Sequence, residues 1–195
     1  MEKINVGLVG AGFFGELHAQ VISQNPNMNF KAIADVNETR AKEVAKKWGA
    51  SSWHRDVEKM LKTEEIEAVS VVTPEQYHRG PAVAAAEAGK HILLEKPIAP
   101  TLQDADAIIN AAKKARVKLQ IGYELRFDPR YAQAKHQIDA GVLGEVVSLY
   151  ARRATNVGLP KRVGTWSHPL FYAAVHDFDM MRWYVGSDVK SVYAQ

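Results

Sequence analysis

The chain contains no cysteine among its 195 residues. Disulfides, thiolate metal ligands and cysteine nucleophiles are therefore excluded, and a reducing cytoplasm is the expected location. Long hydrophobic runs are also lacking, so we expect no membrane span and no membrane partner. The opening residues, Met1-Glu2-Lys3, do not have the pattern of a signal peptide. Internal repeats and low-complexity segments are missing as well, which leaves an ordinary globular composition.

A strong excess of one charge is lacking too. The sequence has 25 Lys and Arg against 22 Asp and Glu, a net charge of +3. The basic residues form only short clusters, at 113–116, 152–153 and 161–162. Nucleic-acid-binding proteins gather such residues into a stripe, so we expect no nucleic-acid partner. The histidines are scattered, and His176-Asp177-x-Asp179 has no recognised metal-ligand spacing, so we expect no metal.

A glycine-rich turn near the amino terminus is the most informative segment present. Gly10-Ala11-Gly12-Phe13-Phe14-Gly15 follows the apolar run 4–9 and precedes a helical pattern. A strand, a tight turn and a helix amino terminus make an anion site from free backbone N–H groups and the helix dipole. Gly10 permits the turn, Gly12 lets a diphosphate approach, and Gly15 lets the helix pack on the strand. We expect Phe13 and Phe14, within the turn, to contact the cofactor as well.

Asp35 identifies the expected cofactor. It ends the second predicted strand, 30–34, and lies twenty positions past Gly15. A carboxylate there accepts hydrogen bonds from an adenosine ribose and repels a 2′-phosphate, which favours NAD over NADP. Against this, Asn37 and Arg40 lie within reach of such a phosphate. The alternative is that the glycines serve only a turn and that Asp35 caps the helix beginning near Glu38.

The first 123 residues alternate strand and helix patterns, whereas residues 124–195 do not. We predict a doubly wound parallel sheet of class α/β over 1–123, because its strand runs are apolar on both faces. We predict that 124–195 begins an α+β domain with an open sheet, in which 145–152 and 189–194 are strands and 128–140 and 170–184 are helices. The predicted strands of the first part are 5–9, 30–34, 51–53, 68–72, 91–94 and 118–122, and its predicted helices are 14–24, 38–48, 56–62, 75–88 and 102–115.

Ligands of such sheets bind beyond the carboxyl ends of the strands. The segments that follow the strands therefore predict one rim, which carries Thr73, Pro74, His78, Lys96 and Tyr123. We predict that Thr73 is a helix N-cap, that Pro74 takes the first helical position, and that this step also touches the cofactor. His78 is equally consistent with a helix-surface residue.

Lys96 stands directly after a buried strand, where an amine needs partners. Pro97 restricts its backbone and permits a cis bond. A lysine near a nicotinamide is able to bind a substrate hydroxyl and share its proton during hydride transfer. The alternative is a surface lysine in a strand-to-helix loop.

A second candidate for proton transfer is His176. It shares a predicted helix face with Asp179, three residues later, and with Tyr172, four residues earlier. Histidine titrates near neutrality, which suits proton exchange with a sugar hydroxyl. The alternative is a core histidine satisfied by a carboxylate.

In order along the chain, these motifs resemble those of the Gfo/Idh/MocA family of NAD(P)-dependent oxidoreductases. The resemblance spans nearly the whole sequence, and its most specific motif is Glu95-Lys96-Pro97. The other motifs that carry it are the glycine turn with Asp35, Thr73-Pro74, Gly122-Tyr123-x-x-Arg126-Phe127-x-Pro129 and His176-Asp177-x-Asp179.

The resemblance implies hydride exchange with a sugar, cyclitol or related polyol, and a homo-oligomer assembled through the second domain. It implies that Lys96 and His176 are catalytic, that Glu95 lies beside the nicotinamide, and that Arg126 lies near the cofactor or substrate. Two departures stand out. Tyr172 occupies a position where many members carry aspartate, so it is a candidate for the proton relay. Members are also longer, so we expect this chain to be truncated at its carboxyl end.

Substrate selection is expected to involve Lys96, Tyr123, Arg153, Asn156 and His176, with Trp166 nearby. Three functions remain open at this point. The first is an NAD(P)-dependent dehydrogenase of polyols. The second is a non-catalytic NAD-binding module that acts as a sensor or partner subunit. The third is an NAD-assisted glycosidase.

Overall fold

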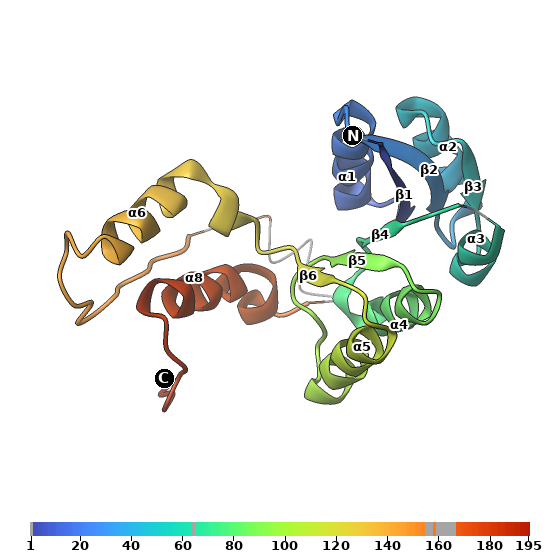
Figure 1. Cartoon of the computed structure of the whole chain (residues 1–195). Coiled ribbons are helices and arrows are strands. Elements are labelled where there is room, and N and C mark those ends of the chain that lie inside the picture. Colours follow the sequence, from blue (N-terminus) through green and yellow to red (C-terminus); the bar gives the residue numbers. More distant parts are fainter. Residues whose placement is uncertain (1, 64, 155–157, 159–166) are drawn as a thin grey trace. The chain divides into compact units, whose positions relative to one another are not determined.

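The computed structural model describes residues 2–63, 65–154, 158 and 167–195 (Figure 1). The chain divides into two compact units, Met1–Gly122 and Tyr123–Gln195. The predicted division at residues 123 and 124 falls next to this boundary.

The described residues of the first unit form a six-stranded sheet with the order β3-β2-β1-β4-β5-β6. Every neighbouring pair is parallel, which requires a crossover between consecutive strands. The chain order reverses between β1 and β4, which is where ligands bind in doubly wound sheets. The strands are β1 Ile4–Val9, β2 Met28–Ala34, β3 Ser52–His54, β4 Ala68–Val71, β5 His91–Leu94 and β6 Leu119–Ile121.

Helices cover both faces of this sheet (Figure 1). Neighbouring residues along a strand point to opposite faces, so Leu8 belongs to the core under α1 and α2, whereas Val9 belongs to the core under α3, α4 and α5. This two-sided burial explains the continuous apolar strand runs and confirms the predicted doubly wound fold. The helices are α1 Phe13–Gln24, α2 Glu38–Trp48, α3 Val57–Thr63, η1 Glu75–Tyr77, α4 Arg79–Glu87 and α5 Leu102–Ala115.

Capping residues set the helix ends. Asn37 is the N-cap of α2, and its side chain accepts a hydrogen bond from the Arg40 N–H, so the alternative that Asp35 caps this helix is wrong. Gly49 ends α2 in the left-handed conformation, with φ of 75°. The predicted single helix over 75–88 is also wrong, because the 3₁₀ turn η1 ends at Tyr77 and α4 begins at Arg79.

The described residues of the second unit are helical or irregular. Its elements are η2 Glu124–Phe127, α6 Pro129–Asp139, η3 Leu170–Ala174 and α8 Val175–Val185. The predicted helix over 170–184 is present, but its first five residues form a π-helix rather than an α-helix. The four-residue spacing between Tyr172 and His176 therefore crosses a change of helical type, so α-helical periodicity does not place them on one face.

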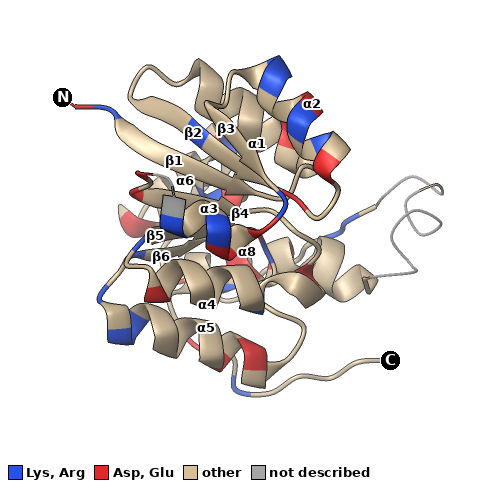
Figure 2. Cartoon of the chain, turned by 90° about the vertical axis from the view of Figure 1, so that its right-hand side faces the viewer, with Lys and Arg blue, Asp and Glu red and all other residues tan. Residues whose placement is uncertain are grey.

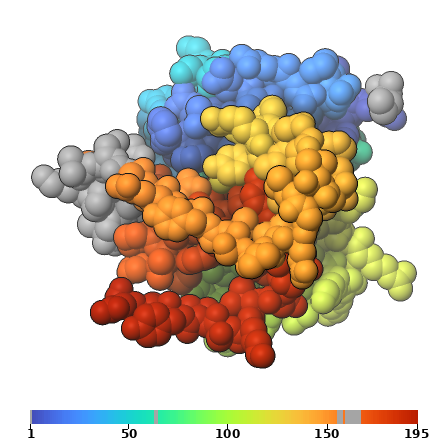
Figure 3. Space-filling model, turned by 90° about the vertical axis from the view of Figure 1, so that its left-hand side faces the viewer, coloured from blue at the N-terminus to red at the C-terminus, as the bar shows by residue number. Residues whose placement is uncertain are grey.

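The predicted strands at 145–152 and 189–194 are not formed, and both segments are irregular. A strand is stabilised by hydrogen bonds to a neighbouring strand, and the described residues of the second unit offer none. Apolar side chains along both segments are consequently exposed, among them Val147 at 93% and Tyr193 at 86%. Figure 3 shows the carboxyl-terminal segment, in dark red, as an extended stretch at the outside of the view.

Candidate functional site: a dinucleotide crevice

The glycine turn at the end of β1 is shaped by two close backbone contacts. Gly10 has a φ of +103°, and a Cβ there would lie 2.6 Å from the Val72 carbonyl oxygen. A Cβ on Gly15 would lie 2.0 Å from the Gly10 carbonyl oxygen. By contrast, a Cβ on Gly12 would meet nothing within 4 Å. Gly10 and Gly15 are therefore needed by the chain itself, while Gly12 leaves open space over the turn.

The amino terminus of α1 opens at this space. Gly12 is its N-cap and supplies no side-chain hydrogen bond, so the first N–H groups of the helix are left for a ligand. Together with the helix dipole, these groups suit a diphosphate. The arrangement fits the phosphate-binding part of a dinucleotide site.

Asp35 lies beside the same turn. Its Oδ2 accepts a hydrogen bond from the Ala11 N–H at 2.6 Å, and its Oδ1 accepts one from the Asn37 N–H at 2.7 Å. Arg40 donates from Nη2 to the Ala11 carbonyl oxygen at 3.2 Å. The structure thus brings Asp35 and Arg40 to the two backbone polar groups of one residue in the glycine turn, the N–H and the carbonyl oxygen of Ala11.

Glu95, directly after β5, contacts His18 and Lys96 through its carboxylate. Its Oε1 lies 3.2 Å from His18 Nε2, and its Oε2 accepts a hydrogen bond from the Lys96 N–H at 3.1 Å. The other ring nitrogen of His18, Nδ1, lies 2.9 Å from Ser70 Oγ. Burial acts to raise the pKa of Glu95, but the hydrogen bond and charge of His18, with help from Lys96, outweigh burial and lower the pKa overall.

Sequence reasoning did not identify His18 and Ser70. A signal was present, because Gly15, Ala19 and Ile22 form the buried stripe of α1 and His18 lies along that stripe. Its partner Glu95 is 77 residues away, which no local pattern specifies.

Lys96 lies at the glycine-turn end of the sheet. Its Nζ is 5.9 Å from the ring centroid of Phe14, in the first turn of α1. The rings of Phe13 and Phe14 pack edge to face, with centroids 6.0 Å apart. The Lys96–Pro97 peptide bond is cis, as the sequence permitted.

The loop after β4 differs from its prediction. Pro74, not Thr73, is the N-cap of η1, so Thr73 does not cap a helix. The buried Thr73 Oγ1 has no hydrogen-bond partner among the described residues, which fits a polar ligand group in this crevice. His78 is only 1% exposed, and its ring nitrogens each lie 2.9 Å from a carbonyl oxygen, of Pro97 and of Thr73. His78 is therefore a buried residue that connects the loop after β4 with the loop after β5, and it is not a surface residue.

Within the second unit, two carboxylates of α8 each hold an arginine. Arg126 donates to both oxygens of Asp179, at 2.8 and 2.6 Å. Arg153 donates to both oxygens of Asp177, at 2.8 and 2.8 Å. The hydrogen bond to Asp179 raises the pKa of Arg126, and the one to Asp177 raises the pKa of Arg153.

His176 is 8% exposed, and its Nε2 lies 3.5 Å from Glu124 Oε1. Glu124 is therefore a carboxylate partner of His176, whereas Asp179, on the predicted shared face, binds Arg126. Burial, and the charge of Asp179 after it, raise the pKa of the Tyr123 hydroxyl. Asn156 and Trp166 lie outside the described residues.

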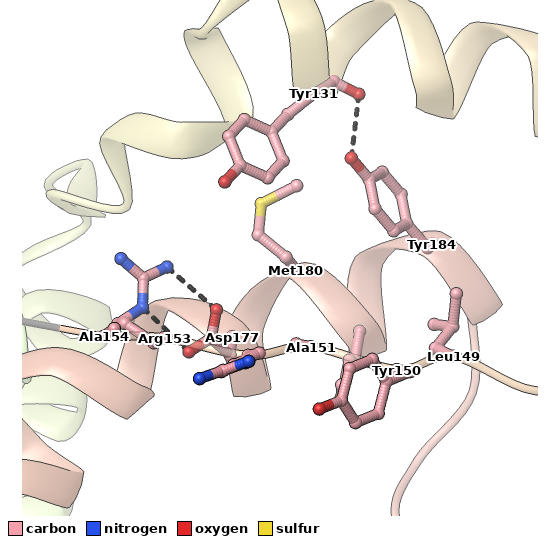
Figure 4. A pocket seen from close by; sticks show the side chains of 11 residues that line it. Tyr131, Leu149, Tyr150, Ala151, Arg153, Ala154, Asp177, Met180 and Tyr184 are labelled. Carbon is pink, nitrogen blue, oxygen red and sulfur yellow. Dashed lines mark hydrogen bonds and ion pairs between the residues drawn. The ribbon is translucent and has the colours of Figure 1, made fainter.

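A pocket of about 430 Å³ lies in the second unit between α6, α8 and residues 149–154 (Figure 4). Met180 projects into it, and the Arg153–Asp177 pair lies at one end. At the other end, the Tyr184 hydroxyl donates to the Tyr131 carbonyl oxygen at 3.2 Å. The pocket combines an apolar floor with one fixed cation.

The described residues contain neither a metal-binding cluster nor a membrane-spanning helix. No group of three or more His, Asp or Glu side chains is arranged to hold a metal ion among them. None of their helices is both long enough and apolar enough to cross a bilayer.

The parallel sheet, its reversal point, the glycine turn and Asp35 define the first unit as a dinucleotide-binding Rossmann domain. Residues 4–123 match the family model of the Gfo/Idh/MocA oxidoreductase family with an NAD-binding Rossmann fold, and residues 131–195 match its C-terminal domain. The chain belongs to this family.

Several relatives of this chain are inositol or sugar dehydrogenases. The scyllo-inositol 2-dehydrogenase (NAD(+)) of Bacillus subtilis is 31% identical over 97% of this chain and 56% of its own length. The levoglucosan dehydrogenase of Pseudarthrobacter phenanthrenivorans is 31% identical over 95% of this chain and 52% of its own. The chain thus spans about half the length of these relatives.

A solved relative has the same fold. The structure of Lactobacillus casei scyllo-inositol dehydrogenase with bound NAD(H) and scyllo-inositol superposes with a TM-score of 0.85 at 26% identity. The superposition covers 95% of this chain and 57% of that one.

Proposed function

We propose that this protein is an NAD-dependent oxidoreductase that transfers a hydride between a polyol, such as a cyclitol or sugar, and the nicotinamide. The observation that carries the proposal is the position of Lys96 Nζ, 5.9 Å from the Phe14 ring at the start of α1. An ammonium group at the glycine-turn end of the sheet is well placed to meet a substrate that reacts with a cofactor bound there.

The residues of the first unit divide the work of binding. The glycine turn and the amino terminus of α1 hold the diphosphate, and Asp35 accepts from the ribose hydroxyls. The same crevice is lined by Phe13, Phe14, Thr73 and Pro74. NAD, when bound, supplies a nicotinamide C4 that accepts a hydride from a substrate C–H bond.

Lys96 binds the reacting hydroxyl and takes part in moving its proton. Glu95 fixes the backbone N–H of Lys96 and thereby orients the lysine. His176 of the second unit is proposed as the acid or base that exchanges the proton with solvent, with Tyr172 as a second candidate. Tyr123 and Arg153 are proposed to contact the polyol, Arg126 to contact the cofactor or substrate, and assembly is proposed to be homo-oligomeric.

The test is turnover of NAD⁺ with a panel of polyols, including scyllo-inositol, myo-inositol and levoglucosan. Lys96→Met is expected to lower kcat/KM by about 10²-fold or more while NAD⁺ still binds, because general acid–base catalysis contributes on that order. Lys90→Met is the matched control, since Lys90 precedes the opposite end of β5. Equal turnover of the Lys96 variant and the wild type would contradict the role of this lysine.

The same assay separates the other functions. NAD⁺ binding without turnover of any polyol would support a non-catalytic module. Release of sugar from a glycoside without net NADH would support a glycosidase.

A further inference from the structure

Arg40, in the first turn of α2, is held by two carboxylates. Its Nη2 donates to Glu16 Oε2 at 3.0 Å, and its Nη1 donates to Glu43 Oε2 at 2.8 Å. Glu16 is itself bound by Lys47 Nζ at 2.6 Å. Figure 2 shows acidic and basic residues interspersed along α2, the helix that carries three of these groups.

The position of this cluster matters because Arg40 also donates to the Ala11 carbonyl oxygen, at 3.2 Å. The Ala11 N–H donates to Asp35 Oδ2 at 2.6 Å. Arg40 therefore binds the carbonyl oxygen of Ala11, and Asp35 binds its N–H. The guanidinium lies at the adenosine-ribose end of the crevice, where a 2′-phosphate would need a cation.

The charges around Arg40 oppose such a phosphate. With Asp35, three carboxylates face two cations, so the cluster carries one negative charge. Hydrogen bonds from Lys47 and Arg40 lower the pKa of Glu16, which keeps it ionised at neutral pH. A 2′-phosphate brings about −1.5 to −2 further charges and would compete with Glu16 and Glu43 for the guanidinium that they already bind. A 2′-hydroxyl meets no such competition.

We propose that Glu16 and Glu43 are specificity-determining residues, which favour NAD over NADP by occupying the Arg40 guanidinium. Asp35 repels the phosphate directly. The two glutamates compete with the phosphate for the Arg40 guanidinium. The inference rests on the proposed dinucleotide site, and it concerns only the choice between the two cofactors.

The experiment measures the dissociation constants of NAD⁺ and NADP⁺ by calorimetry at constant ionic strength. The readout is the ratio of the NADP⁺ constant to the NAD⁺ constant, because loss of negative charge near α1 strengthens the binding of both anions. The double variant Glu16→Gln, Glu43→Gln is expected to lower this ratio roughly tenfold, which is the order of a new hydrogen bond between charged groups.

Two further variants make the test specific. Glu38→Gln removes one negative charge from α2, as Glu43→Gln does, but Glu38 pairs with Lys42 at 2.6 Å and not with Arg40, so the ratio should stay unchanged. Adding Arg40→Gln to the double variant should abolish the gain, since the phosphate then has no guanidinium to bind. Circular dichroism of each variant verifies that it is folded.

An unchanged ratio in the folded double variant would overturn the inference. So would an equal fall in Glu38→Gln, or a gain that survives the loss of Arg40. A wild-type protein that binds neither dinucleotide would instead contradict the proposed site itself, and the inference with it.

Discussion

Removal of the His18 imidazole should destabilise the first unit through Glu95. The two side chains are only 20% and 14% exposed, so the carboxylate that loses this partner is poorly compensated by water. In His18→Ala, Glu95 keeps the hydrogen bond from the Lys96 N–H but loses the one from the ring. We expect a loss of about 2 kcal/mol at pH 7, within the range for a buried polar group left without a partner.

The effect should depend on pH in a defined direction. The pKa of Glu95 is lowered in the folded protein, so its ionised form stabilises the fold above the usual carboxyl pKa. That contribution is lost as pH falls through the lowered value. The difference between wild type and His18→Ala should therefore be full near neutrality and should shrink below about pH 4, where carboxyl groups become protonated.

Urea unfolding followed by circular dichroism measures this loss, which corresponds to a fall in Tm of about 4–8 °C. A cycle with Glu95→Gln isolates the interaction of the two side chains. Ser70→Ala is the matched control, because it removes the far hydrogen bond of the ring but leaves the contact with Glu95. A loss in His18→Ala below about 0.5 kcal/mol, or additive effects in the cycle, would refute the reasoning.

Three further predictions concern the glycine turn, an inner histidine and a helix cap. Gly15→Ala should lower stability by about 1–3 kcal/mol through the clash with the Gly10 carbonyl, whereas Gly12→Ala should keep its Tm but bind NAD⁺ more weakly; equal Tm values for the two would contradict this difference. His78→Ala should cost about 2–4 kcal/mol in urea unfolding, because it leaves a buried cavity and removes the hydrogen bond that the ring donates to a buried carbonyl, and a cost near zero would show that this contact is dispensable. The Arg130 side chain holds the pKa of the α6 N-cap Asp128 at about 2, so this cap stabilises the helix above pH 4 and loses its effect as pH falls toward 2. The Tm difference between wild type and Asp128→Asn should therefore shrink over that range, and a constant difference would contradict the assignment.

The Rossmann unit could be predicted because its signals are local. Runs such as 68–71 are apolar except for Ser70, since both faces of the strand are covered, and Gly15 and Asp35 mark the first crossover by their spacing. The parallel arrangement of the sheet also follows from the alternation of strands and helices.

The second unit was predicted less well because strands depend on distant partners. Residues 145–152 alternate as a strand does, but alternation does not supply a neighbour, and the segment is irregular. The π-helix over Leu170–Ala174 was not predicted either, because its side chains also suit an α-helix.

Within the site, the sequence pointed to the residues that face the crevice and not to those that hold them. Lys96 and Glu95 follow a strand, which any topology places at the rim. His18, Glu16 and Glu43 act through contacts between helices and strands, so only the folded chain identifies them. The catalytic roles of Lys96, His176 and Tyr172 stay predictions.

Gly122 directly follows β6 and lies against the Glu95 carboxylate. A Cβ at residue 122 would lie 2.9 Å from Glu95 Oε1, so the carboxylate occupies the volume that any other residue would fill. The two positions are therefore coupled, because a larger residue at 122 requires the Glu95 carboxylate to move. In a selected library randomised at both positions, we expect alanine at 122 to survive chiefly with aspartate at 95, whose shorter side chain withdraws from the collision.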